Sequence, residues 1–388
     1  MSYKRLGDYV QLVNDRNKDL KVDTLLGVSI TKRLIPSIAN TIGTDMSTYK
    51  IIERGQFAYG TVTSRNGEKI SIALADEYDK ALVSQIYVVF EVIDKNILLP
   101  EYLMMWFSRP EFDRFARYHS HGSTRETFDW DDMCEVELPV PSIERQREIV
   151  GQYQAVGDKI KVNEQICEKL EAIAQTLYKQ WFVDFEFPNE EGLPYKSSGG
   201  LMEYNEELEK EVPVGWEVKS LGEVTNISAG GDKPKVYSDV INAECNIPIY
   251  SNSTDNYGLF GYTNMPKIIK PSITVSARGA IIGYTLLRKY PFVPIVRLIT
   301  ITPYDDEVIY YLFKVIERFK YDDNGSAQGQ LTVPEVSMMN ILYPTNLIIK
   351  GYYKKYKEID LFIDNYKKQS QKFVQLQSLM LSRMVGGE

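Results

Sequence analysis

The chain has 388 residues, more than one ordinary hydrophobic core holds, so its length favours two or three domains. Hydrophobic residues make up 44% and charged residues 25%, as in soluble globular proteins, and the net charge of −8 argues against a free nucleic-acid-binding protein, which is usually basic. The three cysteines are far apart and odd in number, and neither a signal peptide nor an apolar run near ~18 residues occurs, which excludes a disulfide scaffold and a membrane span and predicts a cytoplasmic protein with reduced thiols.

Residues 1–141 predict a mixed α/β domain. The run "QIYVVFEVI" at residues 85–93 has the composition of a strand, and "PEYLMMWFSRPEFDRFARY" at residues 100–118 has the apolar spacing of a helix. Two polar segments rich in turn residues, "SRNGEK" and "HGSTRE", indicate exposed loops.

Residues 142–187 carry the heptad pattern of a coiled coil. The positions of the apolar seam follow at alternating spacings of four and three: Ile149, Tyr153, Val156, Ile160, Asn163, Cys167, Leu170, Ala174, Leu177 and Trp181. A helix from about Ser142 to Phe182 would be roughly 60 Å long and needs a partner along its apolar stripe.

Residues 188–215 predict an exposed linker. This segment holds seven Glu against two Lys and many Pro, Gly and Ser residues. A short helical piece is expected at residues 202–211, "MEYNEELEKE".

Residues 216–344 predict a second mixed α/β domain, and residues 345–388 a second long helix. Strands are expected at residues 272–277 and 296–302, and a helix at residues 306–321. The second helix repeats the seam with Tyr352, Tyr356, Ile359, Ile363, Tyr366, Ser370, Phe373, Gln377, Met380 and Met384.

The two halves of the chain are an internal repeat. "GSTRETFDWDDMCEVELPVP" from Gly122 aligns without a gap with "GSAQGQLTVPEVSMMNILYP" from Gly325. "TSRNGEKISIA" from Thr63 aligns loosely with "SARGAIIGYT" from Ser276, which places Arg65 and Arg278 at corresponding strand ends. We expect a pseudo-twofold pair of domains with two antiparallel coiled-coil helices; in the alternative, each helix packs on its own domain.

The sequence offers no catalytic or metal site. It lacks a dinucleotide-binding glycine motif, a Walker A motif, a nucleophile elbow and H-E-x-x-H. "SITK" at residues 29–32 fits a catalytic S-x-x-K motif by chance spelling, and His119, His121 and Cys134 lack a fourth metal ligand at suitable spacing.

Four segments in order resemble the specificity (S) subunits of type I restriction-modification enzymes: "ELPVPSIERQREIV", "AIAQTLYKQWFVDFE", "GLPYKSSGG" and "VPVGWEVKSLGEV". The resemblance implies two target recognition domains, at residues 1–141 and 216–344, each reading one half of a split DNA site. It also implies that the two long helices space these domains and dock two methyltransferase (M) subunits, and through them restriction (R) subunits.

The resemblance further implies that this chain is not an enzyme. S-adenosylmethionine, ATP and Mg²⁺ are then expected on partner subunits, with no cofactor in this chain. Because the two domains differ strongly in sequence, the double-stranded DNA site should be asymmetric as well as bipartite. The alternative function is a coiled-coil adaptor or scaffold without base-specific recognition.

Polar residues in the turn-like segments are the candidate DNA contacts, because Arg and Lys pair well with guanine, and Asn and Gln with adenine. In the first domain they are Arg65, Asn66, Lys69, His121, Ser123 and Arg125. In the second they are Lys233, Lys235, Asn252, Arg278, Gln328 and Gln330. For each of them, a solvated loop without base contact is the alternative.

The candidate helix-pairing and partner contacts are Ile160, Leu170, Leu177, Tyr178, Trp181, Phe182, Ile359, Ile363, Phe373 and Met380. Four aromatic residues near the end of the first helix, Tyr178, Phe182, Phe185 and Phe187, lie off the seam. They are expected to pack on the opposite recognition domain or to belong to the M-subunit dock, and the sequence leaves both alternatives open.

Overall fold

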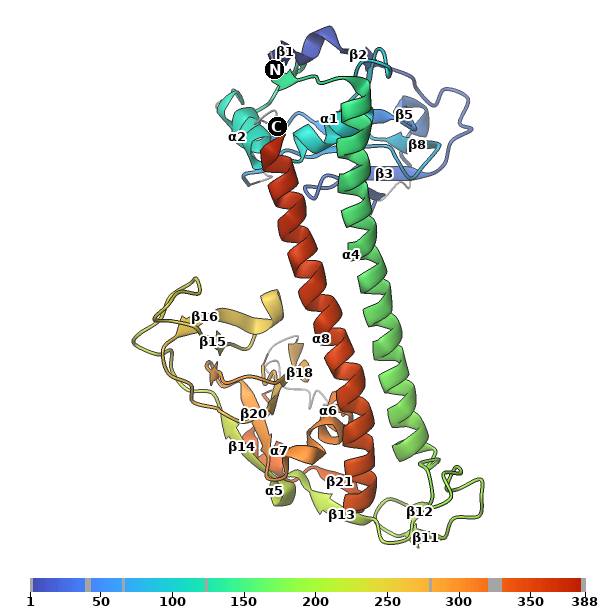
Figure 1. Ribbon diagram of the computed structural model, residues 1–388, viewed down its shortest axis with the longest axis vertical. Helices are drawn as coiled ribbons and strands as arrows, with labels where there is room; N and C mark the ends of the chain where they lie inside the picture. Colours follow the sequence, from blue (N-terminus) through green and yellow to red (C-terminus); the bar gives the residue numbers. More distant parts are fainter. Residues whose placement is uncertain are drawn as a thin grey trace. The chain divides into compact units, whose positions relative to one another are not determined.

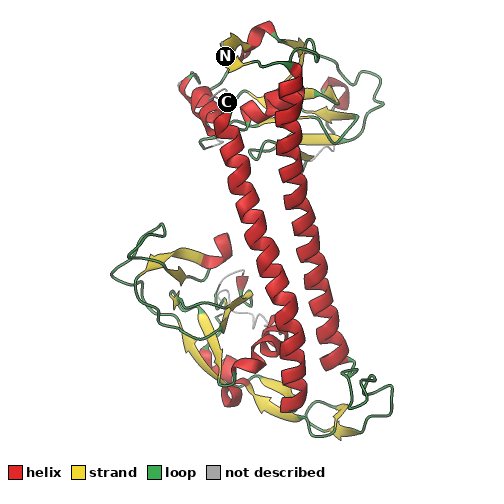
Figure 2. Cartoon of the chain, viewed as in Figure 1, coloured by secondary structure: helices red, strands yellow, loops and turns green. Residues whose placement is uncertain are grey.

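The computed structural model describes residues 3–38, 43–64, 67–122, 125–278, 281–319 and 330–384. The chain divides into two compact units, Met1–Glu164 with Lys367–Glu388, and Gln165–Tyr366. Each unit combines a domain of helices and strands with part of two long helices, α4 (Ile143–Tyr178) and α8 (Asn346–Arg383), as Figures 1 and 2 show.

The first unit contains two four-stranded sheets. Their strand orders are β2-β9-β6-β7 and β4-β3-β8-β5, and β3 pairs with β8 in parallel while the other pairs are antiparallel. The strands are β1 (Tyr3–Arg5), β2 (Val10–Val13), β3 (Leu25–Val28), β4 (Leu34–Pro36), β5 (Lys50–Glu53), β6 (Gln56–Gly60), β7 (Ile72–Leu74), β8 (Lys80–Val83), β9 (Tyr87–Val92) and β10 (Glu137–Pro139). The shorter helices are α1 (Pro100–Phe107), α2 (Pro110–Tyr118) and α3 (Trp130–Cys134).

The predicted single helix at residues 100–118 is wrong, because α1 and α2 are separate. Pro110 has no backbone N–H and therefore cannot continue a helix, but it suits the first position of a new one. Arg109 before it is extended, with φ −75° and ψ 141°. The apolar faces of both helices join the core that contains Phe57 and Phe90, whose rings stack at 4.9 Å.

The second unit repeats this architecture. The sheet order β14-β20-β17-β18 matches β2-β9-β6-β7, and a smaller sheet, β16-β15-β19, again contains one parallel pair, β15 with β19. The strands are β11 (Met202–Asn205), β12 (Lys210–Pro213), β13 (Glu217–Ser220), β14 (Thr225–Ala229), β15 (Ile247–Tyr250), β16 (Leu259–Thr263), β17 (Ser272–Val275), β18 (Thr285–Arg288), β19 (Val293–Pro294), β20 (Ile299–Pro303) and β21 (Asn340–Tyr343). The shorter helices are α5 (Leu221–Val224), α6 (Ile309–Glu317) and α7 (Val333–Ser337).

Corresponding hydrogen bonds show the repeat at the level of single residues. The Tyr102 hydroxyl of α1 donates to the carbonyl of Pro139 at 3.2 Å, and the Tyr311 hydroxyl of α6 donates to the carbonyl of Leu342. Pro139 and Leu342 are aligned by the Gly-Ser repeat. The predicted fold class, a mixed α/β repeat with two long antiparallel helices, is confirmed.

Two predicted elements differ from the structure. Residues 202–211 were expected to include a helix, but β11 and β12 form an antiparallel hairpin there, and the Asn205 side chain accepts the N–H of Leu208 at 2.9 Å in its turn. The strand expected from residue 296 begins at Ile299, because the N–H of Leu298 donates to the carbonyl of Ile295 in a tight turn. Val296 and Arg297 in that turn have φ of 51° and 57°.

The two long helices run antiparallel within each unit. In the first unit, Val150 of α4 belongs to one cluster with Leu381 and Met384 of α8. In the second unit, the rings of Trp181 and Tyr352 lie 5.8 Å apart. All positions of the two predicted seams are buried or half-buried.

One seam layer is polar. Asn163 is only 4% exposed and donates through Nδ2 to Gln369 Oε1 at 2.9 Å and to Ser370 Oγ at 3.3 Å. A buried amide that finds its partners in one alignment of the helices favours that register over others.

The aromatic residues at the end of α4 pack on the second domain. After Tyr178 the helix continues as one π-helical turn, η3 (Lys179–Val183), in which Trp181 and Phe182 are both buried. Phe182 lies 4.6 Å from Tyr311 and 5.9 Å from Trp216, ring centre to ring centre. The core of the second domain therefore accounts for this cluster.

Candidate nucleic-acid interface

A hydrogen-bonded cluster at the end of β17 joins three of the predicted DNA contacts. Arg278 donates from Nη2 to Gln330 Oε1 at 2.9 Å, and the backbones of these two residues form an isolated β-bridge. Both side chains are exposed. Because Gln330 fixes one edge of the guanidinium, Arg278 keeps its other donors for a ligand.

Asn252 supports this cluster from the loop that follows β15. Its Oδ1 accepts the N–H of Ala277 at 2.7 Å, and its Nδ2 donates to the carbonyl of Arg278 at 3.3 Å. Asn252 is half-buried and uses both ends of its amide on the backbone of the β17 end. Asn252 thus holds the backbone on which Arg278 lies, and its contact with adenine stays a prediction.

The corresponding place in the first unit has different side chains. There the N–H of Phe128 donates to the carbonyl of Thr61 at 2.8 Å, and Val62 forms a β-bridge with Thr127. In the second unit the N–H of Leu331 donates to the carbonyl of Ala277 at 2.9 Å, beside the bridge of Arg278 with Gln330.

This pattern corrects the alignment made from sequence. Val62, not Arg65, takes the place of Arg278, because each is bridged to an aligned residue of the Gly-Ser segment. The expectation that Arg65 and Arg278 lie at corresponding strand ends is therefore wrong. The two places differ in chemistry, with an apolar Val62 in the first unit and a guanidinium in the second.

Of the remaining candidates in the first domain, His121 lies beside the bridge of Val62 with Thr127. His121 exchanges two backbone hydrogen bonds with Thr127, both 2.9 Å long, and its side chain and that of Arg125 are exposed. Lys69 is exposed as well. Arg65, Asn66, Ser123 and Gln328 lie outside the described residues.

Lys233 and Lys235 lie on a separate loop of the second unit. The Lys233 ammonium is 3.7 Å from the centre of the Tyr237 ring and 5.6 Å from that of Phe260, so it makes cation–π contacts with these half-exposed rings. Lys235 is exposed. The structure does not bring either lysine into the hydrogen-bonded cluster of Arg278.

Tyr257 and Arg297 lie outside the set of predicted contacts. Both are exposed and have left-handed backbones, with φ of 55° and 57°. Non-glycine residues rarely adopt this conformation, and it leaves no signal in the sequence.

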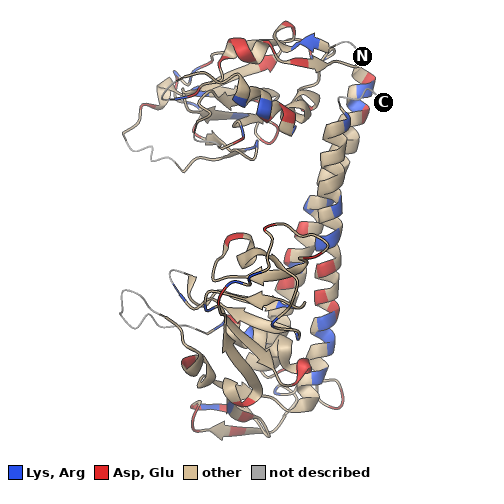
Figure 3. Cartoon of the chain, turned by 90° about the vertical axis from the view of Figure 1, so that its left-hand side faces the viewer, with Lys and Arg blue, Asp and Glu red and all other residues tan. Residues whose placement is uncertain are grey.

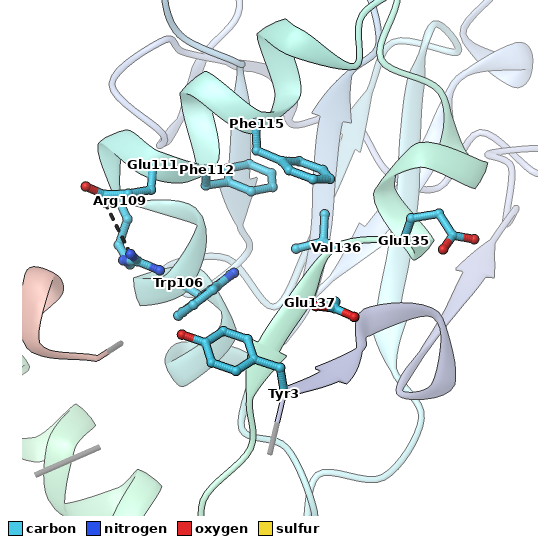
Figure 4. Close-up of a pocket in the computed structure, with 9 residues that line it drawn as sticks. All are labelled: Tyr3, Trp106, Arg109, Glu111, Phe112, Phe115, Glu135, Val136 and Glu137. Atoms are coloured by element: carbon cyan, nitrogen blue, oxygen red, sulfur yellow. Dashed lines mark ion pairs between the residues drawn. The ribbon is translucent and has the colours of Figure 1, made fainter. Parts of the chain in front are cut away.

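The first domain also has a cavity of about 420 Å³ beside β1 and β10 (Figure 4). Its walls include Trp106, and Arg109 covers that ring at 4.1 Å from the guanidinium carbon. Arg109 is 4% exposed, and burial lowers its pKa from the usual value. Three carboxylates also line the cavity, those of Glu111, Glu135 and Glu137, so its charge does not suit a phosphate.

The second domain is tied to α8 by a three-residue ion pair. Lys289 donates to Asp360 at 2.7 Å and to Asp364 at 2.8 Å, and the Tyr310 hydroxyl donates to Asp360 at 3.0 Å. Burial alone would lower the pKa of Lys289, but the two carboxylates together raise it above its usual value. These bonds fix the orientation of the domain on this half of α8.

The sequence of the chain decides its family. The family described as Type I restriction modification DNA specificity domain matches residues 36–172 and 213–368, which hold most of both units. The chain belongs to this family of DNA specificity domains. The match confirms the resemblance predicted from sequence and the role in DNA recognition, and it gives no support to an adaptor without base recognition.

Two relatives and one solved structure show how much of the chain the similarity covers. The type I restriction enzyme MjaIX specificity subunit of Methanocaldococcus jannaschii is 37% identical over 145 residues, which are 37% of this chain and 31% of that protein. The type I restriction enzyme HindI specificity subunit of Haemophilus influenzae is 25% identical over 406 residues, covering 87% of each. The crystal structure of the type I restriction-modification S subunit from M. genitalium shares the fold, with a TM-score of 0.60, 15% identity, and coverage of 99% of this chain and 95% of that one.

Charge in this specificity-family chain is mixed rather than concentrated. Basic and acidic residues are interspersed along the helices and over the domains in the view of Figure 3. With a net charge of −8, the chain lacks the overall basic charge that favours contact with DNA phosphates.

The described residues contain no group of three or more His, Cys, Asp and Glu that could hold a metal ion. His119 instead packs its ring 4.0 Å from that of Phe115. Among the helices that the structure describes, none is long and apolar enough to cross a membrane.

Proposed function

We propose that this chain is the non-catalytic DNA-recognition subunit of a type I restriction-modification complex, and that its two domains read the two halves of an asymmetric, bipartite double-stranded site. The observation that carries the proposal is the exposed Arg278–Gln330 pair at a place where the first domain has Val62 and Thr127. Equivalent backbone positions with different side chains are what two different half-sites require.

In the second domain, the Arg278–Gln330 pair suits a contact in the major groove. An arginine can donate two hydrogen bonds to guanine, to O6 and N7, and Gln330 holds one of its edges. In the first domain, Val62 is 37% exposed and offers an apolar contact of the kind that suits a thymine methyl group. Arg125 and His121 would add polar contacts from the neighbouring loop.

We also propose that two M subunits dock on the long helices, one on each unit. Ile173 of α4 and Leu376 of α8 are 53% and 43% exposed, although each lies on a helix whose seam is already filled. They occupy aligned positions of the repeat. An exposed apolar residue repeated on each helix fits two copies of one partner.

The chemical steps would then belong to partners. S-adenosylmethionine would be bound by the M subunits, and ATP and Mg²⁺ would be used with the R subunits that join through them. The assembled complex would act in the cytoplasm, where it meets genomic DNA. The chain itself would hold no cofactor.

Adenine methylation mapped at single-base resolution tests this function. The chain is expressed together with candidate methyltransferase (M) subunits from its own genome, in a bacterial host without other adenine methylation, and the host genome is sequenced for modified adenines. A split, asymmetric motif that requires this chain is expected. The same motif in cells that express the methyltransferase alone would refute the proposal.

A further inference from the structure

The loop between β15 and β16, residues 251–258, has an unusual backbone. Three consecutive residues are left-handed: Asn256 with φ 46°, Tyr257 with φ 55° and Gly258 with φ 78°. Glycine tolerates this region and asparagine does so in part, but a tyrosine there is strained. The fold must therefore hold Tyr257 in place at a cost in stability.

Arg288 of β18 holds Tyr257 in this conformation. It is 8% exposed and donates from Nη2 to the carbonyl of Tyr257 at 2.7 Å and from Nε to Thr274 Oγ1 at 3.1 Å. Its guanidinium carbon lies 3.6 Å from the centre of the Tyr250 ring.

The charge of Arg288 is not neutralised by a carboxylate from any residue that the structure describes. Burying a cation in this way is unfavourable unless its hydrogen bonds compensate. One of those bonds ends on the strained residue. The hydrogen bond between the buried Arg288 and the strained Tyr257 thus holds the loop in a single conformation.

The same loop reaches the cluster at the end of β17. Asn252, near its start, bonds to the backbone of Ala277 and Arg278. The N–H of Ser251 donates to the carbonyl of Gly258 at 2.8 Å, which closes the loop on itself. Tyr257 is 67% exposed on this closed loop.

We propose that Tyr257 contacts duplex DNA and determines part of the second half-site, and that Arg288 is its positioning residue. The inference rests on the proposed function. A tyrosine ring offers an apolar face for a thymine methyl group or a deoxyribose, and its hydroxyl can bond to a base edge or a phosphate. Strain retained at an exposed residue is typical of functional positions.

The corresponding hairpin of the first unit lacks such a residue. The loop between β3 and β4 also contains a left-handed residue, Lys32, with φ 63°. Its side chain is only 9% exposed, and its ammonium pairs with Asp113 at 2.8 Å. The first loop is therefore anchored by its own left-handed residue, so a change at Tyr257 should affect one half-site alone.

Variants in the complex assembled with M subunits test the proposal. Methylation rates are measured on duplexes that carry the mapped site and each single-base change, and unfolding temperatures are measured on the same preparations. For Tyr257→Ala we expect at least a tenfold loss of discrimination at positions of one half-site, with the other half-site unchanged. Tyr290→Ala, at a tyrosine that is 63% exposed in the same unit, is the matched control and should change neither.

Tyr257→Gly separates recognition from folding. Glycine relieves the backbone strain, so this variant should unfold at a higher temperature than the wild type and still lose discrimination. Arg288→Lys should weaken discrimination at the same base positions, because the single nitrogen of lysine cannot replace the two guanidinium nitrogens that donate to Tyr257 and Thr274. Unchanged selectivity in both Tyr257→Ala and Tyr257→Gly would overturn the inference, whereas a wild-type complex without any sequence preference would overturn the proposed function and the inference with it.

Discussion

Recognition of the second half-site should depend on the exposed guanidinium of Arg278. Arg278→Ala should lower the methylation rate at the cognate site by the equivalent of about 1 to 3 kcal/mol and relax the preference for guanine at one position. Steady-state rates on duplexes with single-base changes measure both effects. Lys270→Ala, at a half-exposed lysine paired with Asp306, is the control and should change neither.

Gln330 should act through Arg278. Gln330→Ala leaves the guanidinium free to rotate, so the loss should be smaller than that of Arg278→Ala, and the double variant should cost little more than Arg278→Ala alone. Fully additive losses in the double-mutant cycle would show that the two side chains contact DNA independently.

Single residues were the least predictable from sequence. The candidate loops of the second domain included Arg278, Asn252 and Gln330, because turn-forming polar segments are visible locally. The sequence alignment missed the register of the first domain by three residues, since short strands align well at several offsets. Tyr257 and Arg288 could not be found, because their roles depend on a backbone conformation and a contact across two strands.

At the scale of elements, the polar layer at Asn163 sets the alignment of α4 with α8. Asn163→Leu should raise the unfolding free energy by about 1 kcal/mol, because an apolar side chain packs in the seam without the cost of burying an amide. It should also widen the range of spacer lengths tolerated between half-sites. Calorimetry and methylation of duplexes with longer and shorter spacers test the two effects, and a destabilised variant with unchanged spacer preference would contradict this role.

The aromatic cluster at the end of α4 should carry much of the stability of the second unit. Phe182 is 5% exposed and contacts Trp216, Tyr311 and Tyr352. Phe182→Ala should cost about 3 to 5 kcal/mol of unfolding free energy. Val183→Ala is a matched control on the next residue, because Val183 is 43% exposed, and it should cost far less.

The ion pair of Lys289 with α8 should orient the second domain. Lys289→Met removes the ammonium and leaves Asp360 and Asp364 facing each other, half-buried and without their shared cation. We expect a lower unfolding temperature and slower methylation without a change in the preferred bases. A changed base preference would instead place Lys289 at the DNA.

The elements divide into those with a local signal and those without one. Both long helices and their seams were predictable, because heptad spacing is visible along a single segment. The break at Pro110 and the hairpin of β11 with β12 were missed: the first because the apolar spacing continues across the proline, the second because "MEYNEELEKE" is rich in helix formers. The packing of Tyr178 and Phe182 on the second domain required the tertiary contacts.

At the scale of the whole molecule, the internal repeat was predictable from the sequence. The net negative charge of the whole chain leads to a further prediction about DNA binding. With a net charge of −8, the isolated chain should bind duplex DNA weakly, with a shallow dependence of affinity on salt concentration. Adding the methyltransferase should raise both the affinity and the salt dependence. Tight binding of the free chain would contradict this expectation.

An exchange of the two recognition domains tests directly whether each domain reads one half-site. A chain in which residues 1–141 and 216–344 have changed places is expressed with the M subunits, and methylated adenines are mapped across the host genome. If each domain reads one half-site, the two halves of the motif should exchange places while the bases within each half stay the same. An unchanged motif would show that the two domains do not carry the specificity.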